Sequence, residues 1–146
     1  MSQVIEAKAK MIRILLVEDS KFLRLATERA LARAGYEVCS AADGDEALLL
    51  ARQKLPDLIL LDMLLPKMSG PDVLKALKQD AATKSIAVVV MTGMSEKNAA
   101  RLRQDGAIAF LEKSALELDK GPAKLLTSLQ KILDLLPHVQ ARTTTA

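Results

Sequence analysis

The chain has few of the residues that most often build metal centres and covalent cross-links. Its 146 residues include one cysteine, one histidine and no tryptophan. The single cysteine, Cys39, excludes an internal disulfide and a cysteine-based metal cluster, which suits a reducing compartment. The single histidine, His138, lies near the C-terminus, and this position argues against a zinc site.

Aromatic residues, long apolar runs and an excess of one charge are also scarce. The three aromatic residues provide no stacking platform for single-stranded nucleic acid. The 21 basic and 18 acidic residues leave a net charge of +3, and the basic ones are spread along the chain rather than clustered. No apolar run approaches the roughly 18 residues that a membrane span needs, and residues 1–10 lack the apolar segment of a signal peptide. We therefore expect a cytoplasmic protein with no direct nucleic-acid binding and no membrane insertion.

Short apolar runs and helical patterns alternate along the chain. Half of the residues are hydrophobic, which suffices for one compact core. Five apolar runs, each too short for a typical helix, predict strands at 12–17, 36–41, 58–61, 86–91 and 107–111. Apolar spacing and capping residues predict helices at Ser20–Gly35, from Asp43, from Gly70, at Ser95–Gly106 and at Pro122–Leu136.

Strict alternation of strands and helices predicts a parallel sheet with helices on both faces. We therefore expect one α/β domain over residues 11–136. Residues 1–10 would form an N-terminal extension and residues 137–146 a flexible C-terminal tail.

Polar residues follow four of the predicted strands. They are Glu18, Asp19, Asp62, Thr92 and Lys113. Each has an ordinary explanation: the aspartates as turn or cap residues, the threonine as a helix-entry hydroxyl, the lysine as solvated surface. Together they predict a ligand site, because ligand sites of parallel sheets lie at the carboxyl ends of the strands. Asp62 stands within an apolar run, where an ionised carboxylate is costly to bury without a partner.

The chemistry of these five groups is specific. Three carboxylates suit a hard cation that keeps several waters, which describes Mg²⁺ better than Zn²⁺. A carboxylate beside such an ion can act as a nucleophile and become an acyl phosphate, which would explain Asp62. The Lys113 ammonium and the Thr92 hydroxyl could then donate to the phosphoryl oxygens.

Four segments give the chain a resemblance to the receiver domains of two-component response regulators. They are VEDS at 17–20, LLDMLLPKMSG at 60–70, VVVMTG at 88–93 and AFLEKS at 109–114. The resemblance covers about residues 11–136. It implies a flavodoxin-like (βα)5 fold whose five-stranded parallel sheet has the order 2-1-3-4-5, a detail that periodicity alone does not supply.

The resemblance also implies a role for each site residue. Asp62 would accept the phosphoryl group, and Lys113 would form an ion pair with it. Thr92 would be drawn toward the new phosphate, and Phe110 would turn between outward and inward positions; an ordinary core role is the alternative for Phe110. The cofactor would be Mg²⁺, with Glu18, Asp19, Asp62 and the backbone carbonyl of Leu64 as its protein ligands.

The partners follow from the same resemblance. The phosphoryl donor would be a histidine kinase or a histidine phosphotransfer protein. A downstream target protein would bind through the fourth helix, fifth strand and fifth helix, and a homodimer could use the same elements. Because about ten residues follow the last predicted helix, we expect a stand-alone receiver. It would catalyse only its own phosphorylation and dephosphorylation.

Some positions depart from the family pattern. Ser114 stands where proline usually follows the lysine, so the geometry of the Lys113–Ser114 peptide is open. The connection 114–121 is longer than usual. Leu64 and Met94 lie where the family controls access of attacking water, and their apolar side chains predict slow hydrolysis of the phosphate.

Other functions and other pathways stay open at this point. A phosphorylation-independent binding module could use the same fold, but a degenerate member would be expected to lack one of the five site groups. A phosphatase would need a second carboxylate as general acid at the position of Leu64. A phosphorelay intermediate, a chemotaxis-type regulator and a domain of a longer protein all fit the sequence.

Overall fold

A computed structural model describes residues 11–93 and 99–137. Five parallel strands form one sheet in the order β2-β1-β3-β4-β5, as the resemblance implied. The strands are β1 (Arg13–Val17), β2 (Glu37–Ala41), β3 (Leu58–Asp62), β4 (Ala87–Thr92) and β5 (Ala109–Glu112). The helices are α2 (Lys21–Arg33), α3 (Gly44–Lys54), α4 (Gly70–Gln79), α5 (Ala99–Gln104), α6 (Lys113–Leu116), the 3₁₀ helix η2 (Leu118–Lys120) and α7 (Ala123–Asp134).

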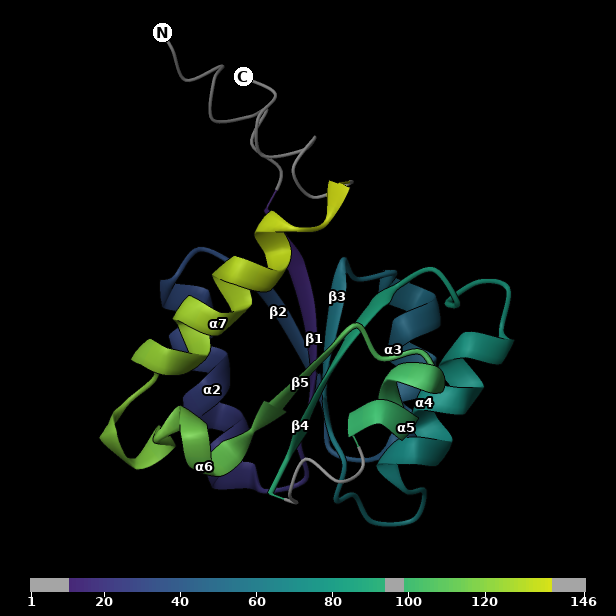
Figure 1. The fold of residues 1–146 in the computed structure, drawn as a ribbon, viewed down its shortest axis with the longest axis horizontal. Coiled ribbons are helices and arrows are strands. Elements are labelled where there is room, and N and C mark those ends of the chain that lie inside the picture. Colours follow the sequence, from purple (N-terminus) through teal and green to yellow (C-terminus); the bar gives the residue numbers. More distant parts are fainter. Residues whose placement is uncertain (1–10, 94–98, 138–146) are drawn as a thin grey trace, which may run out of the picture.

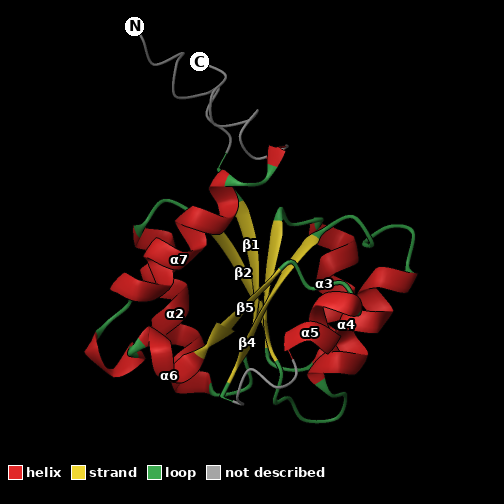
Figure 2. Cartoon of the chain, in the orientation of Figure 1, coloured by secondary structure: helices red, strands yellow, loops and turns green. Residues whose placement is uncertain are grey.

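Helices cover both faces of the sheet, which Figures 1 and 2 show nearly edge-on. Helices α3, α4 and α5 lie on one side and α2, α6 and α7 on the other. Successive residues of β3 serve opposite cores: Leu61 packs with the first group of helices and Leu60 with the second. Each fully buried leucine contributes about 1.5 to 3 kcal/mol to the stability of the fold, so burial on both faces of the sheet stabilises the central strands. Within the described ranges, no helix is long and apolar enough to cross a membrane.

Capping bonds confirm two of the predicted helix starts. The Ser20 hydroxyl accepts a bond from the Leu23 amide at 3.3 Å, and Asp43 accepts one from Glu46 at 2.9 Å. The third helix does begin at Gly70, with Ser69 as its cap. The predicted cap Ser95 lies outside the described residues.

Three strands, β3, β4 and β5, end one residue later than the sequence predicted. Asp62 is the last residue of β3 and pairs with Met91, whereas the prediction ended this strand at residue 61. Thr92 is likewise the last residue of β4, opposite Glu112. The fifth strand begins at Ala109 rather than at 107. The site residues Asp62 and Thr92 are therefore held in place by strand pairing within the sheet.

The connection between β5 and α7 contains α6 and η2, which the sequence analysis did not predict. Leu116 is 4% exposed and anchors α6 in the core on the α2 and α7 side. Glu117 has a left-handed backbone (φ 49°), and its carboxylate accepts from Lys120 and Lys124, which ties η2 to α7. No cis peptide bond occurs in the described part of the chain, so the Lys113–Ser114 peptide is trans.

Candidate functional site

Three carboxylates meet at the carboxyl edge of the sheet. Glu18 and Asp19 directly follow β1. Asp62 is the last residue of β3, which lies beside β1 in the sheet. One ligand oxygen from each residue lies within 4.8 Å of the other two. The structure thus brings together the three acids that the sequence analysis selected, and their oxygens are spaced closely enough to share one cation.

Two of these acids are buried. Glu18 and Asp62 are each 2% exposed, whereas Asp19 is exposed. Burying two carboxylates costs several kcal/mol unless a cation pairs with them. Lys113 is that cation, because its Nζ lies 3.0 Å from Asp62 Oδ2 and 3.2 Å from Glu18 Oε1. Its backbone position as the first residue of α6, directly after β5, carries the ammonium over the sheet edge.

Backbone amides hold the second oxygen of each buried carboxylate. The Leu64 amide donates to Asp62 Oδ1 at 3.1 Å, and the Ser20 amide donates to Glu18 Oε2 at 3.2 Å. Each carboxylate therefore has one oxygen on Lys113 and the other on a backbone N–H. This arrangement fixes the orientation of both groups before any ligand binds.

The charges of the cluster shift the protonation equilibria of two members. The pKa of the Glu18 carboxyl is raised, first by burial and then by the nearby negative charge of Asp62, although Lys113 partly opposes this. Burial by itself would lower the pKa of Lys113, but its bond to Asp62 and the charges of both acids outweigh burial and raise that pKa. Lys113 therefore stays a cation at neutral pH.

The loop after Asp62 is fixed by a close backbone approach. The Gly70 amide donates to the Met63 carbonyl at 3.1 Å, and the Met63 amide donates to the Met91 carbonyl at 3.0 Å. A Cβ at position 70 would lie 2.5 Å from Met63 Cα, so glycine is required there. Leu64 extends from this fixed loop with its side chain 64% exposed.

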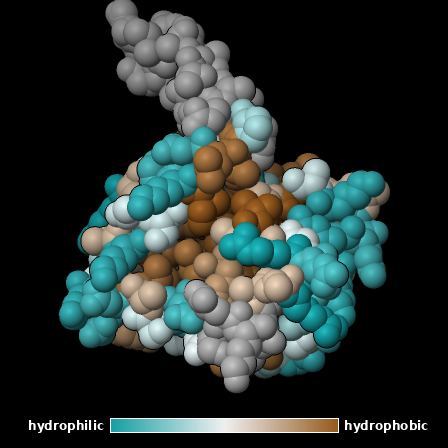
Figure 3. Space-filling model, viewed as in Figure 1, coloured by the Kyte–Doolittle hydropathy of each residue, from teal (hydrophilic) through white to brown (hydrophobic). Residues whose placement is uncertain are grey.

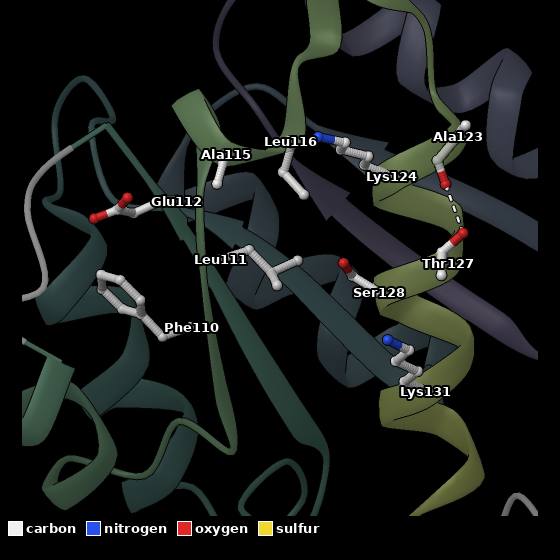
Figure 4. A pocket seen from close by; sticks show the side chains of 10 residues that line it. All are labelled: Phe110, Leu111, Glu112, Ala115, Leu116, Ala123, Lys124, Thr127, Ser128 and Lys131. Carbon is white, nitrogen blue, oxygen red and sulfur yellow. Dashed lines mark hydrogen bonds between the residues drawn. The ribbon is translucent and has the colours of Figure 1, made fainter.

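Thr92 and Phe110 also lie at or near this edge. Thr92 is 1% exposed at the end of β4, one residue beyond Met91, the register partner of Asp62. Phe110 is half-buried and packs against the core on the α3, α4 and α5 side, projecting from the opposite side of β5 to Leu111 (Figure 4). This position fits a core residue and a switch residue alike, so its switch role stays a prediction. Met94 lies outside the described residues.

Arg24 is the contact of the acid pair that the sequence analysis missed. Its Nη1 donates to the backbone carbonyl of Glu18 at 2.9 Å and to that of Asp19 at 3.4 Å. A signal was available in the sequence, because Lys21 and Arg24 open α2 and no acidic residue accompanies them. Helix starts usually favour acidic residues.

A groove lies between β5, α6 and α7 (Figure 4). Leu111 and Leu116 contribute apolar surface, and Lys124 and Lys131 contribute two cations. Figure 3 shows apolar surface gathered over β5, between α7 and α5. None of the three site carboxylates lines the groove, but one lining residue, Glu112, directly precedes Lys113 in the chain.

Comparison with known proteins agrees with the geometry. Residues 14–121 match the family model described as the response regulator receiver domain. The polar-differentiation response regulator DivK of Brucella anthropi is 38% identical over 101 residues, which span 68% of this chain and 82% of that protein.

Solved structures share the fold. The chemotaxis response regulator CheY4 of Vibrio cholerae aligns with a TM-score of 0.75 and 31% identity, over 84% of this chain and 99% of that one. The phosphorylated cyanobacterial phytochrome response regulator RcpA aligns with a TM-score of 0.67 and 31% identity, over 84% and 91% of the two chains.

Proposed function

The chain belongs to the response regulator receiver family, and on that premise we propose that it accepts a phosphoryl group on the carboxylate of Asp62. One observation carries the proposal: the buried Asp62 is bonded to Lys113 at 3.0 Å and lies within 4.8 Å of the ligand oxygens of Glu18 and Asp19. Phosphoryl transfer needs mainly positioning and charge neutralisation, and this cluster offers both.

The proposed cofactor is Mg²⁺. Its side-chain ligands would be Glu18, Asp19 and Asp62, and the backbone carbonyl of Leu64 would be a further ligand. The three acids offer only oxygen donors, and Asp19 is exposed, which suits a hard cation that retains several waters. When bound, the ion would neutralise charge on the phosphoryl oxygens.

The proposed donor is a phosphohistidine of a histidine kinase or a histidine phosphotransfer protein. A carboxylate oxygen of Asp62 attacks phosphorus, the P–N bond breaks, and its electron pair returns to the imidazole nitrogen. Lys113 and Thr92 donate to the phosphoryl oxygens. Attack of water on phosphorus later restores the carboxylate. The protein is thus a signalling protein whose proposed chemistry is confined to its own Asp62.

The new phosphate would bias a conformational switch. The phosphoryl group carries about −1.5 to −2 charge and replaces the single charge of the Asp62 carboxylate, so Lys113 must divide its bonds between a more highly charged group and Glu18. In this proposal Thr92 moves toward the phosphate at the end of β4. Phe110, on neighbouring β5, then turns inward into the space that Thr92 leaves.

The proposed output surface consists of α5, β5 and α7. Apolar surface gathers there (Figure 3), and patches of this kind on a soluble domain mark interaction sites. A downstream target protein is the proposed occupant, and a homodimer through the same elements is the second arrangement. The groove of Figure 4 adjoins this surface and has Phe110 among its lining residues, so a turn of that side chain would alter its wall.

Intact-mass analysis tests the proposed function. The full chain is incubated with acetyl phosphate in Mg²⁺ or in chelator, together with Asp62→Asn and the surface control Asp119→Asn. We expect one phosphoryl group on the wild type and on Asp119→Asn in Mg²⁺ only, and none on Asp62→Asn. Full labelling of Asp62→Asn would exclude Asp62 as the acceptor. A wild type that stays unlabelled would favour a phosphorylation-independent binding module.

A further inference from the structure

The first turn of α2 lacks the acidic residues that helix N-termini usually contain. After its cap Ser20 come Lys21 and Arg24 without any acidic residue, whereas the first turn of α3 contains Asp45 and Glu46. Cations at a helix N-terminus oppose the helix macrodipole. Natural sequences break such local rules mostly at functional sites, so these cations need an explanation outside the helix.

The contacts of Arg24 explain why a cation stands at the start of α2. Its side chain is half-buried, and its Nη1 bonds the carbonyl oxygens of Glu18 and Asp19 at 2.9 and 3.4 Å. Its own amide bonds the Ser20 carbonyl at 2.8 Å as part of the first helical turn. Arg24 therefore joins the rigid start of α2 to the two peptide groups that carry the acid pair.

The two acids depend on this link to different degrees. Glu18 is also held by its amide, which donates to the Ala41 carbonyl at 3.0 Å, and by the bonds from Lys113 and Ser20 to its carboxylate. Asp19 is exposed, and the bond from Arg24 ties its peptide group to α2. The direction of the Asp19 carboxylate should therefore depend most on Arg24.

We propose that Arg24 is a positioning residue of the magnesium site, whose two hydrogen bonds hold the Glu18–Asp19 turn so that both carboxylates face the metal. This inference rests on the proposed function, since it assumes that the acid triad binds Mg²⁺. Groups that orient metal ligands without touching the metal often determine affinity, because a ligand that is already ordered loses less freedom on binding.

The sign of the effect separates positioning from simple electrostatics. A cation near a metal site repels the metal, so if charge alone mattered, removing Arg24 would tighten Mg²⁺ binding. The guanidinium, however, bonds carbonyl oxygens rather than the carboxylates. If its bonds position the acids, removing it must weaken Mg²⁺ binding instead.

Calorimetric titration of the full chain with Mg²⁺ tests the inference, without any phosphoryl donor. We expect Arg24→Met to raise the Kd for Mg²⁺ about 10-fold. Arg24→Lys should recover part of the loss, because an ammonium can donate to a carbonyl but lacks the planar fork. The matched control Arg29→Met removes an exposed arginine from the same helix and should stay within about two-fold of the wild type. Urea unfolding in chelator verifies that each variant is folded.

Unchanged or tighter Mg²⁺ binding by folded Arg24→Met would overturn the inference, and so would an equal loss in Arg29→Met. If Arg24→Met does not fold, Arg24→Lys decides: a weakened Kd supports the positioning role, and a wild-type Kd overturns it. A wild type that binds no Mg²⁺ would overturn the magnesium site itself and the inference with it. The failure of the inference alone is thus distinct from the failure of the proposed function.

Discussion

Lys113 and Asp62 are 51 positions apart in the sequence, yet the lysine Nζ lies 3.0 Å from the aspartate Oδ2. The same ammonium lies 3.2 Å from Glu18 Oε1, and both acids are buried. One cation therefore offsets two buried anions. This balance links the stability of the domain to its chemistry, because any ligand that changes the charge of the cluster must redistribute the bonds of Lys113.

Lys113→Met should destabilise the metal-free protein. It leaves two buried carboxylates without a cation, a change that costs about 2 to 3 kcal/mol once the partial exposure of the lysine is taken into account. Urea unfolding at neutral pH in chelator measures the loss. The control Lys120→Met removes an exposed lysine that pairs with Glu117, and it should change stability by less than about 0.5 kcal/mol. Equal, small losses in the two variants would show that the buried pair contributes little.

Asp19→Asn should have the opposite effect on the metal-free protein. Asp19 adds a third negative charge within 4.8 Å of the other two acids and has no ion pair to Lys113 among the described contacts. Removing its charge relieves repulsion, which solvent screens, so we expect a gain of about 0.5 to 1 kcal/mol in urea unfolding. Mg²⁺ should then stabilise the wild type more than the variant. A variant less stable than the wild type in chelator would indicate an ordinary turn residue.

The raised pKa of Glu18 predicts a pH dependence. Burial, and then the charge of Asp62, make the folded protein bind a proton at Glu18 more tightly than the unfolded chain, whose pKa is near 4.5. The contribution of Glu18 to stability therefore falls as the pH rises above 4.5 through the folded pKa. In chelator, the stability of Glu18→Gln relative to the wild type should increase from about pH 5 to about pH 7. A flat or falling difference would contradict the raised pKa.

The lifetime of the phosphate should depend on Leu64. Its side chain is 64% exposed on the loop directly after Asp62, and Met94 is its sequence counterpart after Thr92. Replacing both by asparagine offers hydrogen bonds to an attacking water, so we expect the phosphorylated protein to lose its label faster, by about three-fold or more. Pulse-chase labelling with radioactive phosphate measures this. An unchanged or longer lifetime would remove water exclusion by these apolar side chains as the explanation.

The fold was largely predictable because its signals are local. Leu60 and Leu61 are both buried, on opposite faces, and so β3 appears in the sequence as an unbroken apolar run. Ser20 and Asp43 act as caps through bonds to amides three residues later, a spacing that is visible in the sequence. No local signal determines the order of the strands in the sheet, so that order was predicted from the family resemblance alone.

The features that were missed depend on tertiary contacts. Helix α6 has four residues, too few for a periodic pattern, and Leu116 fixes it only by entering a core built from distant segments. Asp62 and Thr92 belong to strands because neighbouring strands pair with them, which no single strand sequence reveals. The same holds for the shared ammonium of Lys113: the sequence selected the residue, but the bond to Glu18 required the folded arrangement.

The identity of the phosphorylated residue tests the central claim most directly. The full chain is labelled with acetyl phosphate and Mg²⁺ and then treated with borohydride, which reduces an aspartyl phosphate to homoserine while leaving free carboxylates intact. Peptide mass mapping should find homoserine at position 62, in the peptide that contains Leu60, Leu61 and Met63, and only in samples that received both donor and Mg²⁺. Homoserine at another aspartate, or an unmodified Asp62 in a labelled protein, would contradict the account.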